Sequence, residues 1–240
     1  MAESENGSSS SFKIILGSSS SSRRQILTEM GYEFTILTAD IDEKDIRKEK
    51  PEELVMALAE AKADAIISRL QLSNFQEKDA EPTLLITADT VVVYEGVIRE
   101  KPSNKDEARR FIKGLFNMFL PYLLPELAGS LVNSTCFAGY SGGHASTVGS
   151  VLVTNLKTGI RKGGYDRVEV YFHDIPDEII DNLIDEGIVL NVAGGLMLEH
   201  PLTLPFVEAV IDGTVQMGAA DSVMGLPKAL TEKLIQESLL

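Results

Sequence analysis

The chain has 240 residues, of which 44% are hydrophobic and 24% are charged, and its formal net charge at pH 7 is −14. This composition is typical of a globular protein with one large core or two small ones. A chain this acidic is a poor candidate for binding along a nucleic-acid backbone, which requires a basic surface. We therefore expect no nucleic-acid partner, although a local cluster of Lys and Arg could still hold a small phosphorylated ligand.

Two features bear on the location of the protein. Residues 1–11 are polar and rich in Ser, and they lack the basic segment and apolar core of a secretory signal. Cys136 is the only cysteine, which rules out an internal disulfide and fits a reducing compartment. We expect a disordered tail over 1–11, a single domain over 12–240 and a cytoplasmic protein.

The first part of the chain alternates between strand and helix patterns. Apolar runs at 12–16 and 33–37 indicate strands, whereas residues 23–30 have apolar positions at helical spacing. Pro51, followed by two acids, marks the start of a longer helix that runs to about Leu70.

The same alternation continues to the end of the chain. Apolar segments predict strand structure over 83–94, with a hairpin-like return at Glu95–Gly96. Two later strands are expected around a Gly-rich turn at Gly163–Gly164. The remaining expected elements are helices over 105–113, 176–186 and 227–239, and strands over 147–155, 167–172 and 204–211. Because strands and helices interleave throughout, the predicted fold class is α/β.

The loop after the first strand has the composition of an anion-binding site. Gly17 is followed by five serines and then by Arg23 and Arg24, which open a helix. Serine hydroxyls, the free N–H groups of a helix start and a guanidinium can together hold a phosphate. The loop is not a P-loop, because no Gly-Lys-Ser/Thr follows. The alternative is a serine run before a surface helix with two solvated arginines.

Asp89 is an acid within an otherwise apolar strand. A carboxylate there is costly unless it is paired, bound to metal or used in chemistry. The alternative is a turn residue between two short strands, but no Gly, Pro or Asn flanks it. A carboxylate at this place could bind Mg²⁺ or take a proton from water.

Other charged residues could complete such a site. Asp40, Asp42 and Glu43 form an acidic loop that could supply further metal ligands. Lys62 lies among alanines on a helix, and Lys101 precedes Pro102 and could neutralise phosphate charge. Each of these residues could instead be solvated. Taken together, they favour metal-assisted hydrolysis of a phosphate compound.

Six short motifs carry a resemblance to a known family. The first three are residues 17–24, 40–43 and 59–63, and the others are residues 87–92, 100–102 and 225–227. In this order they resemble the Maf family of nucleotide pyrophosphatases, and the resemblance covers nearly all of 12–114 and 140–240.

The resemblance implies a fold, a reaction and roles for residues. The family has a mixed sheet with flanking helices around a central cleft, similar to inosine triphosphate pyrophosphatases. Its members cut nucleoside triphosphates to monophosphate and pyrophosphate with Mg²⁺ or Mn²⁺, and they are often homodimers. Asp89 matches the catalytic acid. The matches to the family's polar cluster are Arg23, Glu43, Lys62 and Lys101.

We therefore expect a site with three kinds of residue. The expected catalytic residues are Asp89, Lys101 and Arg23. The expected substrate-binding residues are Ser18, Ser22, Arg24, Lys62, Thr90 and Glu199. Asp89 and Glu43 are expected to bind the divalent metal. Asp89, or a water that it orients, is expected to drive the attack on the α-phosphorus.

The base preference is predicted from the C-terminal half. Ala193-Gly194, followed by Glu199, resembles the 7-methyl-GTP branch of the family, whereas the dTTP/UTP branch has a glutamine. A carboxylate can accept two hydrogen bonds from a guanine edge, so we favour a modified purine, with dTTP/UTP as the alternative. The family's link to septum formation leaves a non-catalytic nucleotide-binding regulator as another alternative. A haloacid-type phosphatase would require Asp-x-Asp at a strand end, which Asp89 lacks.

Residues 115–139 depart from the family pattern. They begin with a strongly apolar run of 18 residues, 115–132, which two prolines and a glutamate interrupt. A membrane-spanning helix usually needs about 20 apolar residues without such interruptions. We expect no membrane partner. The composition resembles translated non-coding sequence, so we hypothesise an unspliced intron or an incorrect gene model, and a genuine insertion remains the alternative.

Overall fold

The computed structural model describes residues 12–70, 81–113, 139–212 and 220–240. Its centre is a seven-stranded sheet in the order β2-β1-β3-β5-β6-β7, with β4 paired to β3 beside this path. β1 pairs in parallel with β2 and β3, and the other pairs are antiparallel. The strands are β1 (Lys13–Leu16), β2 (Phe34–Ile36), β3 (Thr83–Tyr94), β4 (Val97–Arg99), β5 (His144–Asn155), β6 (Arg161–Phe172) and β7 (Val207–Asp212). The predicted α/β class with a mixed sheet and flanking helices is confirmed.

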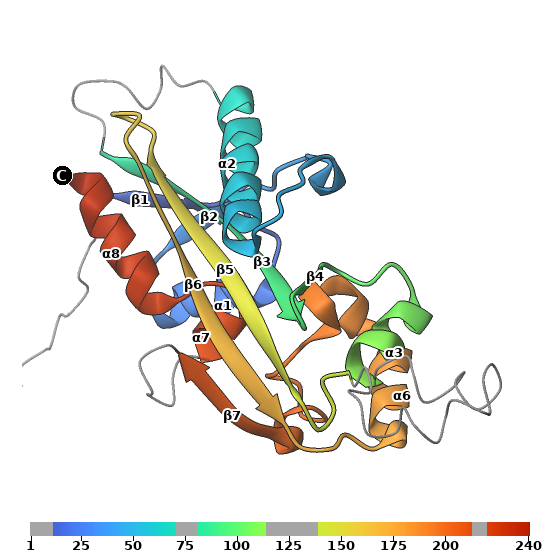
Figure 1. The fold of residues 1–240 in the computed structure, drawn as a ribbon. Coiled ribbons are helices and arrows are strands. Elements are labelled where there is room, and N and C mark those ends of the chain that lie inside the picture. Colours follow the sequence, from blue (N-terminus) through green and yellow to red (C-terminus); the bar gives the residue numbers. More distant parts are fainter. Residues whose placement is uncertain (1–11, 71–80, 114–138, 213–219) are drawn as a thin grey trace, which may run out of the picture.

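Helices cover both faces of this sheet (Figure 1). The α-helices are α1 (Ser21–Glu29), α2 (Pro51–Arg69), α3 (Lys105–Lys113), α6 (Asp177–Glu186), α7 (Ala220–Val223) and α8 (Lys228–Leu239). The 3-10 helices are η1 (Glu43–Asp45), η3 (Ile188–Asn191), η4 (Ala193–Gly195) and η5 (Leu204–Phe206). None of the helices in the described ranges has both the length and the apolar content needed to cross a membrane.

The core follows the alternation of side chains along the strands. Successive residues of a strand point to opposite faces of the sheet. Ile14 and Leu84 accordingly pack in a cluster with residues of α1 and α8. Ile15 and Leu85 pack on the other face with residues of α2. In Figure 1, α2 and α8 lie on opposite sides of the long β5–β6 ribbon. α3 and α6 lie side by side beyond the end of β3 and contribute to a third cluster.

A gap in the strand pairing leaves part of β3 open along one edge. The register of β1 with β3 ends at Leu16 opposite Ile86, and β4 joins the same edge only at Arg99 opposite Val92. Residues 87–91 therefore have no strand partner on this edge within the described chain, although β5 pairs with them on the other. Side chains from both faces of β3 can reach the gap, and Asp89 lies in it.

Most predicted elements agree with the structure to within a few residues, but the turn predicted at Gly163–Gly164 is wrong. Both glycines lie inside β6, and the β5–β6 turn is at 156–160. A Cβ atom on Gly163 would lie 2.7 Å from Cε of Met56 in α2, and one on Gly164 would lie 3.0 Å from Cδ1 of Leu230 in α8. The glycines therefore let two helices approach the strand from opposite faces.

Two sequence predictions fall on segments that the structure does not cover. The tail at 1–11 and the apolar segment at 115–139 lie outside the described residues, apart from Gly139. Both stay predictions.

Gly17 provides a test of the close packing at the open edge of β3. A Cβ atom there would lie 2.5 Å from Cγ2 of Thr87, 2.8 Å from Cδ1 of Ile66 and 3.2 Å from the carbonyl oxygen of Ile86. We expect Gly17→Ala to lower the free energy of unfolding by about 1–3 kcal/mol through overpacking, as measured by urea denaturation. Gly149→Ala is the control, because its new Cβ would lie 3.6 Å or more from its neighbours. Equal stability of the two variants would contradict the packing account.

Candidate active site

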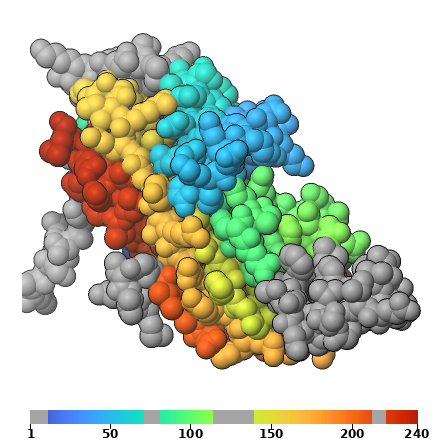
Figure 2. Space-filling view, in the orientation of Figure 1, coloured from blue at the N-terminus to red at the C-terminus, as the bar shows by residue number. Residues whose placement is uncertain are grey.

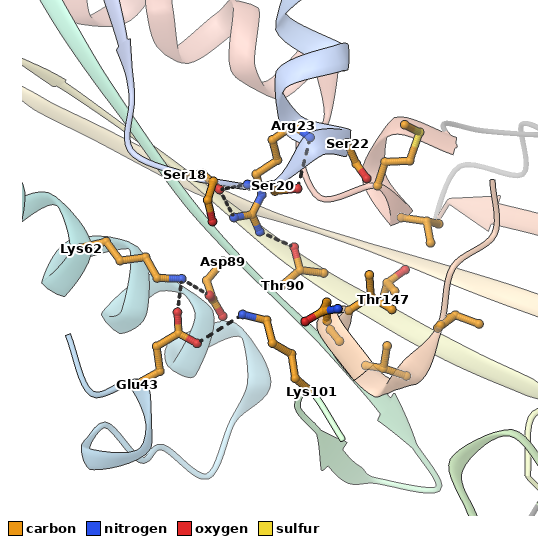
Figure 3. Close-up of a pocket in the computed structure, with 18 of the residues that line it drawn as sticks. Ser18, Ser20, Ser22, Arg23, Glu43, Lys62, Asp89, Thr90, Lys101 and Thr147 are labelled. Atoms are coloured by element: carbon orange, nitrogen blue, oxygen red, sulfur yellow. Dashed lines mark hydrogen bonds and ion pairs between the residues drawn. The ribbon is translucent and has the colours of Figure 1, made fainter. Parts of the chain in front are cut away.

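A cavity of about 220 Å³ lies at the open edge of β3. Nine of the ten residues predicted for the site line it. These nine residues are Ser18, Ser22, Arg23, Glu43, Lys62, Asp89, Thr90, Lys101 and Glu199. Figure 3 shows the side chains of Lys62, Glu43, Asp89 and Lys101 pointing toward one another. In the space-filling view the residues of η1 and the loop around it (blue) lie against α2 (cyan) (Figure 2).

Lys62 joins the two carboxylates at the centre of the cavity. Its Nζ lies 2.5 Å from Oδ1 of Asp89 and 2.8 Å from Oε1 of Glu43 (Figure 3). Lys62 is 8% exposed and Asp89 7% exposed. Removing one partner of such a buried pair is strongly destabilising, because the other charge is left without compensation. Asp89 therefore has a charge partner, and the cost of burying its carboxylate in an apolar strand is offset by the pairing with Lys62.

The packing of α2 explains how Lys62 reaches Asp89. Ala59 and Ala63 are fully buried on the face of α2 that meets the sheet, and such small side chains let the helix lie close to the strands. The hydroxyl of Thr87 donates a hydrogen bond of 2.8 Å to the carbonyl of Ala59. Lys62 lies between these alanines in sequence and extends into the cavity.

Glu43 enters the cavity from the start of η1. Asp42 caps this turn, since its Oδ1 accepts a hydrogen bond of 2.9 Å from the N–H of Lys44. Burial raises the pKa of Glu43, but the charge and hydrogen bond of Lys62 and the charges of Lys101 and Arg23 outweigh it, so the pKa lies below its ordinary value. Neither Asp40 nor Asp42 lines the cavity.

Arg23 is an anchor for the walls of the cavity rather than a free cation. Its Nε donates to the carbonyl of Gly225 at 2.9 Å, and its Nη1 donates to the carbonyl of Ala88 at 2.9 Å. Further bonds run from Nη1 to Oγ of Ser18 and from Nη2 to Oγ1 of Thr90. Four of its five N–H groups are thus occupied. Burial lowers the pKa of Arg23, and the charges of Asp89 and Glu43 oppose this effect.

The serine loop is folded by its own hydroxyls. Oγ of Ser20 accepts from the N–H of Arg23 and caps α1, while Oγ of Ser18 accepts from the N–H of Ser20. Ser22 donates a hydrogen bond of 3.0 Å to Oε1 of Glu199. The loop and the residue predicted to recognise the base are therefore in direct contact.

Arg24 is the exception among the predicted site residues. It is exposed on α1 and does not line the cavity, so its position does not support a substrate-binding role. Consecutive residues of a helix point in directions about 100° apart. Since Arg23 faces inward, Arg24 faces the solvent.

Lys101 is the most accessible cation of the cavity. Its side chain is 57% exposed, and its Nζ lies 3.8 Å from Oε2 of Glu43. A weak, solvated pair of this kind contributes little to stability. Lys101 is therefore free to contact an incoming anion.

The residues of one wall of the cavity were not predicted from the sequence. Val92 and Thr147 face each other across β3 and β5, and Leu196 and Val223 come from later segments. These side chains are apolar or buried and carry no charge pattern. The strand register would have been required to place Val92 and Thr147 together.

The donor set fits a divalent cation that is shared with a substrate. No group of three or more His, Cys, Asp or Glu residues that could hold a metal occurs among the described residues. Asp89 and Glu43 each give one oxygen to Lys62, and Oδ2 of Asp89 accepts no hydrogen bond from the described part of the chain. Mg²⁺ is usually held by one or two carboxylates together with substrate phosphates and water.

The lowered pKa of Glu43 predicts a pH-dependent stability. Its ionised form is favoured in the folded state, so its contribution is present above the ordinary pKa of 4.5 and is lost as the pH falls through the lower folded value. We expect Glu43→Gln to reduce the free energy of unfolding more at pH 6–7 than at pH 3. Glu60→Gln, at an exposed position on α2, is the control. A Glu43→Gln effect that does not vary with pH would contradict the charge pairing.

Comparison with known proteins identifies the family. A family model described as Maf-like protein matches residues 13–118 and 133–238, which include every residue that lines the cavity. The chain is 36% identical to a 7-methyl-GTP pyrophosphatase of Dictyostelium discoideum, over 93% of this chain and 96% of that protein. It is 28% identical to a dTTP/UTP pyrophosphatase of Alkaliphilus metalliredigens, over 90% of each chain.

Two further comparisons concern another named pyrophosphatase and a solved structure. A nucleoside triphosphate pyrophosphatase of a Synechococcus species is 29% identical over 93% of each chain. A solved dITP/XTP pyrophosphatase of Mycobacterium abscessus aligns with 13% identity and a TM-score of 0.32, over 68% of this chain and 74% of that one. The family match spans most of the sequence, and the chain therefore belongs to the Maf-like protein family.

Proposed function

We propose that this protein hydrolyses a nucleoside triphosphate to a nucleoside monophosphate and pyrophosphate. The main observation in support of this proposal is the buried Lys62–Asp89 ion pair. This pair lines the same cavity as Lys101 and the serine loop. The relatives named as pyrophosphatases support it. A buried, paired acid beside a cluster of cations is an arrangement suited to hydrolysis of a phosphoanhydride.

Asp89 is the proposed general base. Lys62 holds Oδ1, so the position of the carboxylate is fixed while Oδ2 remains available to water. A water molecule oriented by Oδ2 would transfer its proton to Asp89 and attack the α-phosphorus. The serine loop, fixed by Arg23, and the exposed ammonium of Lys101 would hold the phosphates in line for this attack.

The charges of the cavity favour a divalent cation as cofactor. The cavity is lined by equal numbers of basic and acidic side chains. The basic residues are Arg23, Lys62 and Lys101, and the acidic residues are Glu43, Asp89 and Glu199. The side chains therefore offer no excess positive charge to the several negative charges of a triphosphate. Asp89 and Glu43 would hold Mg²⁺ or Mn²⁺ with the carboxylate lone pairs that Lys62 and the water do not use. A bound cation would neutralise charge on the phosphate oxygens and stabilise the departing pyrophosphate.

Replacing Asp89 tests its role. Asp89→Asn retains the size of the side chain and a hydrogen-bond acceptor for Lys62, but it cannot accept a proton. We expect kcat for pyrophosphate release to fall by about 10²- to 10⁴-fold. The circular dichroism spectrum should stay that of the folded protein, because Lys62 keeps its charge partner Glu43.

The matched control is Asp64→Asn, which removes an exposed acid of α2 that pairs with Arg161. It should retain full activity. Undiminished turnover by Asp89→Asn would refute the proposed role. Tight triphosphate binding by the wild type without pyrophosphate release would favour a regulatory nucleotide-binding protein instead.

We further propose that the nucleoside is a modified purine such as 7-methylguanosine. Glu199 lines the cavity near the apolar wall, and its carboxylate could accept two hydrogen bonds from a guanine edge. The similarity to a 7-methyl-GTP pyrophosphatase over nearly the whole chain supports this choice.

Glu199→Gln tests the base preference. An amide offers only one acceptor, so kcat/KM for 7-methyl-GTP should fall by about 10- to 100-fold, the loss expected for a hydrogen bond to a charged group. Release of pyrophosphate from 7-methyl-GTP, GTP, dTTP and UTP should be measured with Mg²⁺ for both proteins. Preference of the wild type for dTTP or UTP would contradict the assignment.

A further inference from the structure

Arg99 lies among three aromatic rings at the end of β4. Its guanidinium carbon is 4.4 Å from the ring centre of Tyr94, 4.9 Å from that of Phe111 and 5.1 Å from that of Tyr140. A guanidinium over aromatic rings is attracted by their electron-rich faces, more strongly where water is excluded. Tyr140 is 1% exposed and Tyr94 7% exposed. Arg99 is therefore fixed in direction, two residues before Lys101.

The same cluster is attached to the C-terminal end of α3. Nη1 of Arg99 donates a hydrogen bond of 3.0 Å to the carbonyl of Phe111, and the N–H of Tyr140 donates to the same carbonyl at 3.4 Å. The last carbonyls of a helix lack partners within the helix and carry partial negative charge. The arginine and the tyrosine backbone thus satisfy one of them.

Tyr140 connects this cluster to a turn of the cavity wall. Its hydroxyl donates a hydrogen bond of 3.0 Å to the carbonyl of Gly194. Burial raises the pKa of Tyr140 to about 12, so the hydroxyl keeps its proton at neutral pH. The N–H of Gly194 donates to the carbonyl of Glu100 at 2.8 Å. Gly194 is therefore held from both sides.

Gly194 is packed closely against Tyr140 and β3. Its φ of +62° lies in the left-handed region, and a Cβ atom would lie 2.6 Å from Cβ of Val92 and 2.7 Å from the hydroxyl of Tyr140. The backbone of the turn is thus packed directly on β3. Ala193 and Leu196, on either side of it, line the cavity, as does Glu199.

We propose that Tyr140, held by Arg99, is a positioning residue for the nucleoside part of the substrate. This inference rests on the proposed function. The Tyr140–Gly194 bond fixes the turn that leads into the segment of Leu196 and Glu199, whereas Asp89, Lys62 and the serine loop form no hydrogen bond with Gly194. Loss of the bond should therefore weaken recognition of the nucleoside and leave the phosphate site intact.

Tyr140→Phe tests the proposal, because it removes the hydroxyl and keeps the ring. KM for the preferred nucleoside triphosphate should rise by about 3- to 10-fold, the effect of one lost hydrogen bond, while kcat changes by less than about twofold. The inhibition constant of inorganic tripolyphosphate, which has no nucleoside, should stay the same. Arg99→Met removes the cation that holds the tyrosine ring. It should likewise raise KM while kcat and the inhibition constant of tripolyphosphate stay nearly unchanged.

Tyr94→Phe is the matched control. Tyr94 belongs to the same ring cluster, but its hydroxyl forms no hydrogen bond with a described residue, so KM should not change. Equal losses in kcat, nucleotide affinity and tripolyphosphate inhibition, or no change in KM, would overturn the positioning role. If the wild type neither hydrolyses nor binds nucleoside triphosphates, the proposed function itself fails. An active wild type with an unaffected Tyr140→Phe refutes only the role of Tyr140.

Discussion

The site depends on one buried ion pair, that between Lys62 and Asp89. A carboxylate in the middle of an aliphatic strand is stable only with a partner, and Lys62 supplies that partner from α2 at 2.5 Å. The same ammonium holds Glu43, so one lysine organises two acids that belong to different elements. Pairing through a single oxygen of Asp89 leaves the other oxygen for chemistry. An interaction required for stability thus also orients the proposed general base.

The sheet provides the space for this arrangement. β3 is paired on both edges at its two ends, but residues 87–91 have a strand partner on one edge only. At Ala88 the side chain of Arg23 donates a hydrogen bond to the carbonyl that a neighbouring strand would otherwise bind. Arg23 also donates a hydrogen bond to the carbonyl of Gly225. The gap lets side chains from both faces of β3 share one cavity. This explains why neighbouring residues Asp89 and Thr90 both line it.

The sequence indicated which charged residues line the cavity, because a charge in an apolar context is costly and therefore informative. Asp89 stood out in this way, and Lys62 and Glu43 followed from the family resemblance. The sequence did not predict that most N–H groups of the Arg23 guanidinium donate to carbonyls and hydroxyls of the protein, since these acceptors come from distant segments. The turn predicted at Gly163 and Gly164 was wrong because glycine permits both tight turns and close helix packing, and the sequence alone does not distinguish the two. The wall formed by Val92, Thr147 and Leu196 has no local signal and arises only from strand register and tertiary contacts.

The most direct test is whether a divalent cation links Asp89 to the substrate phosphates. The affinity of a nucleoside triphosphate analogue with a methylene group between the α- and β-phosphorus should be measured by calorimetry with and without Mn²⁺, in the wild type and in Asp89→Asn. We predict that Mn²⁺ tightens binding to the wild type by about tenfold or more, a typical coupling between two ligands, and that Asp89→Asn loses this gain. An equal gain in both proteins, or none in the wild type, would contradict the account.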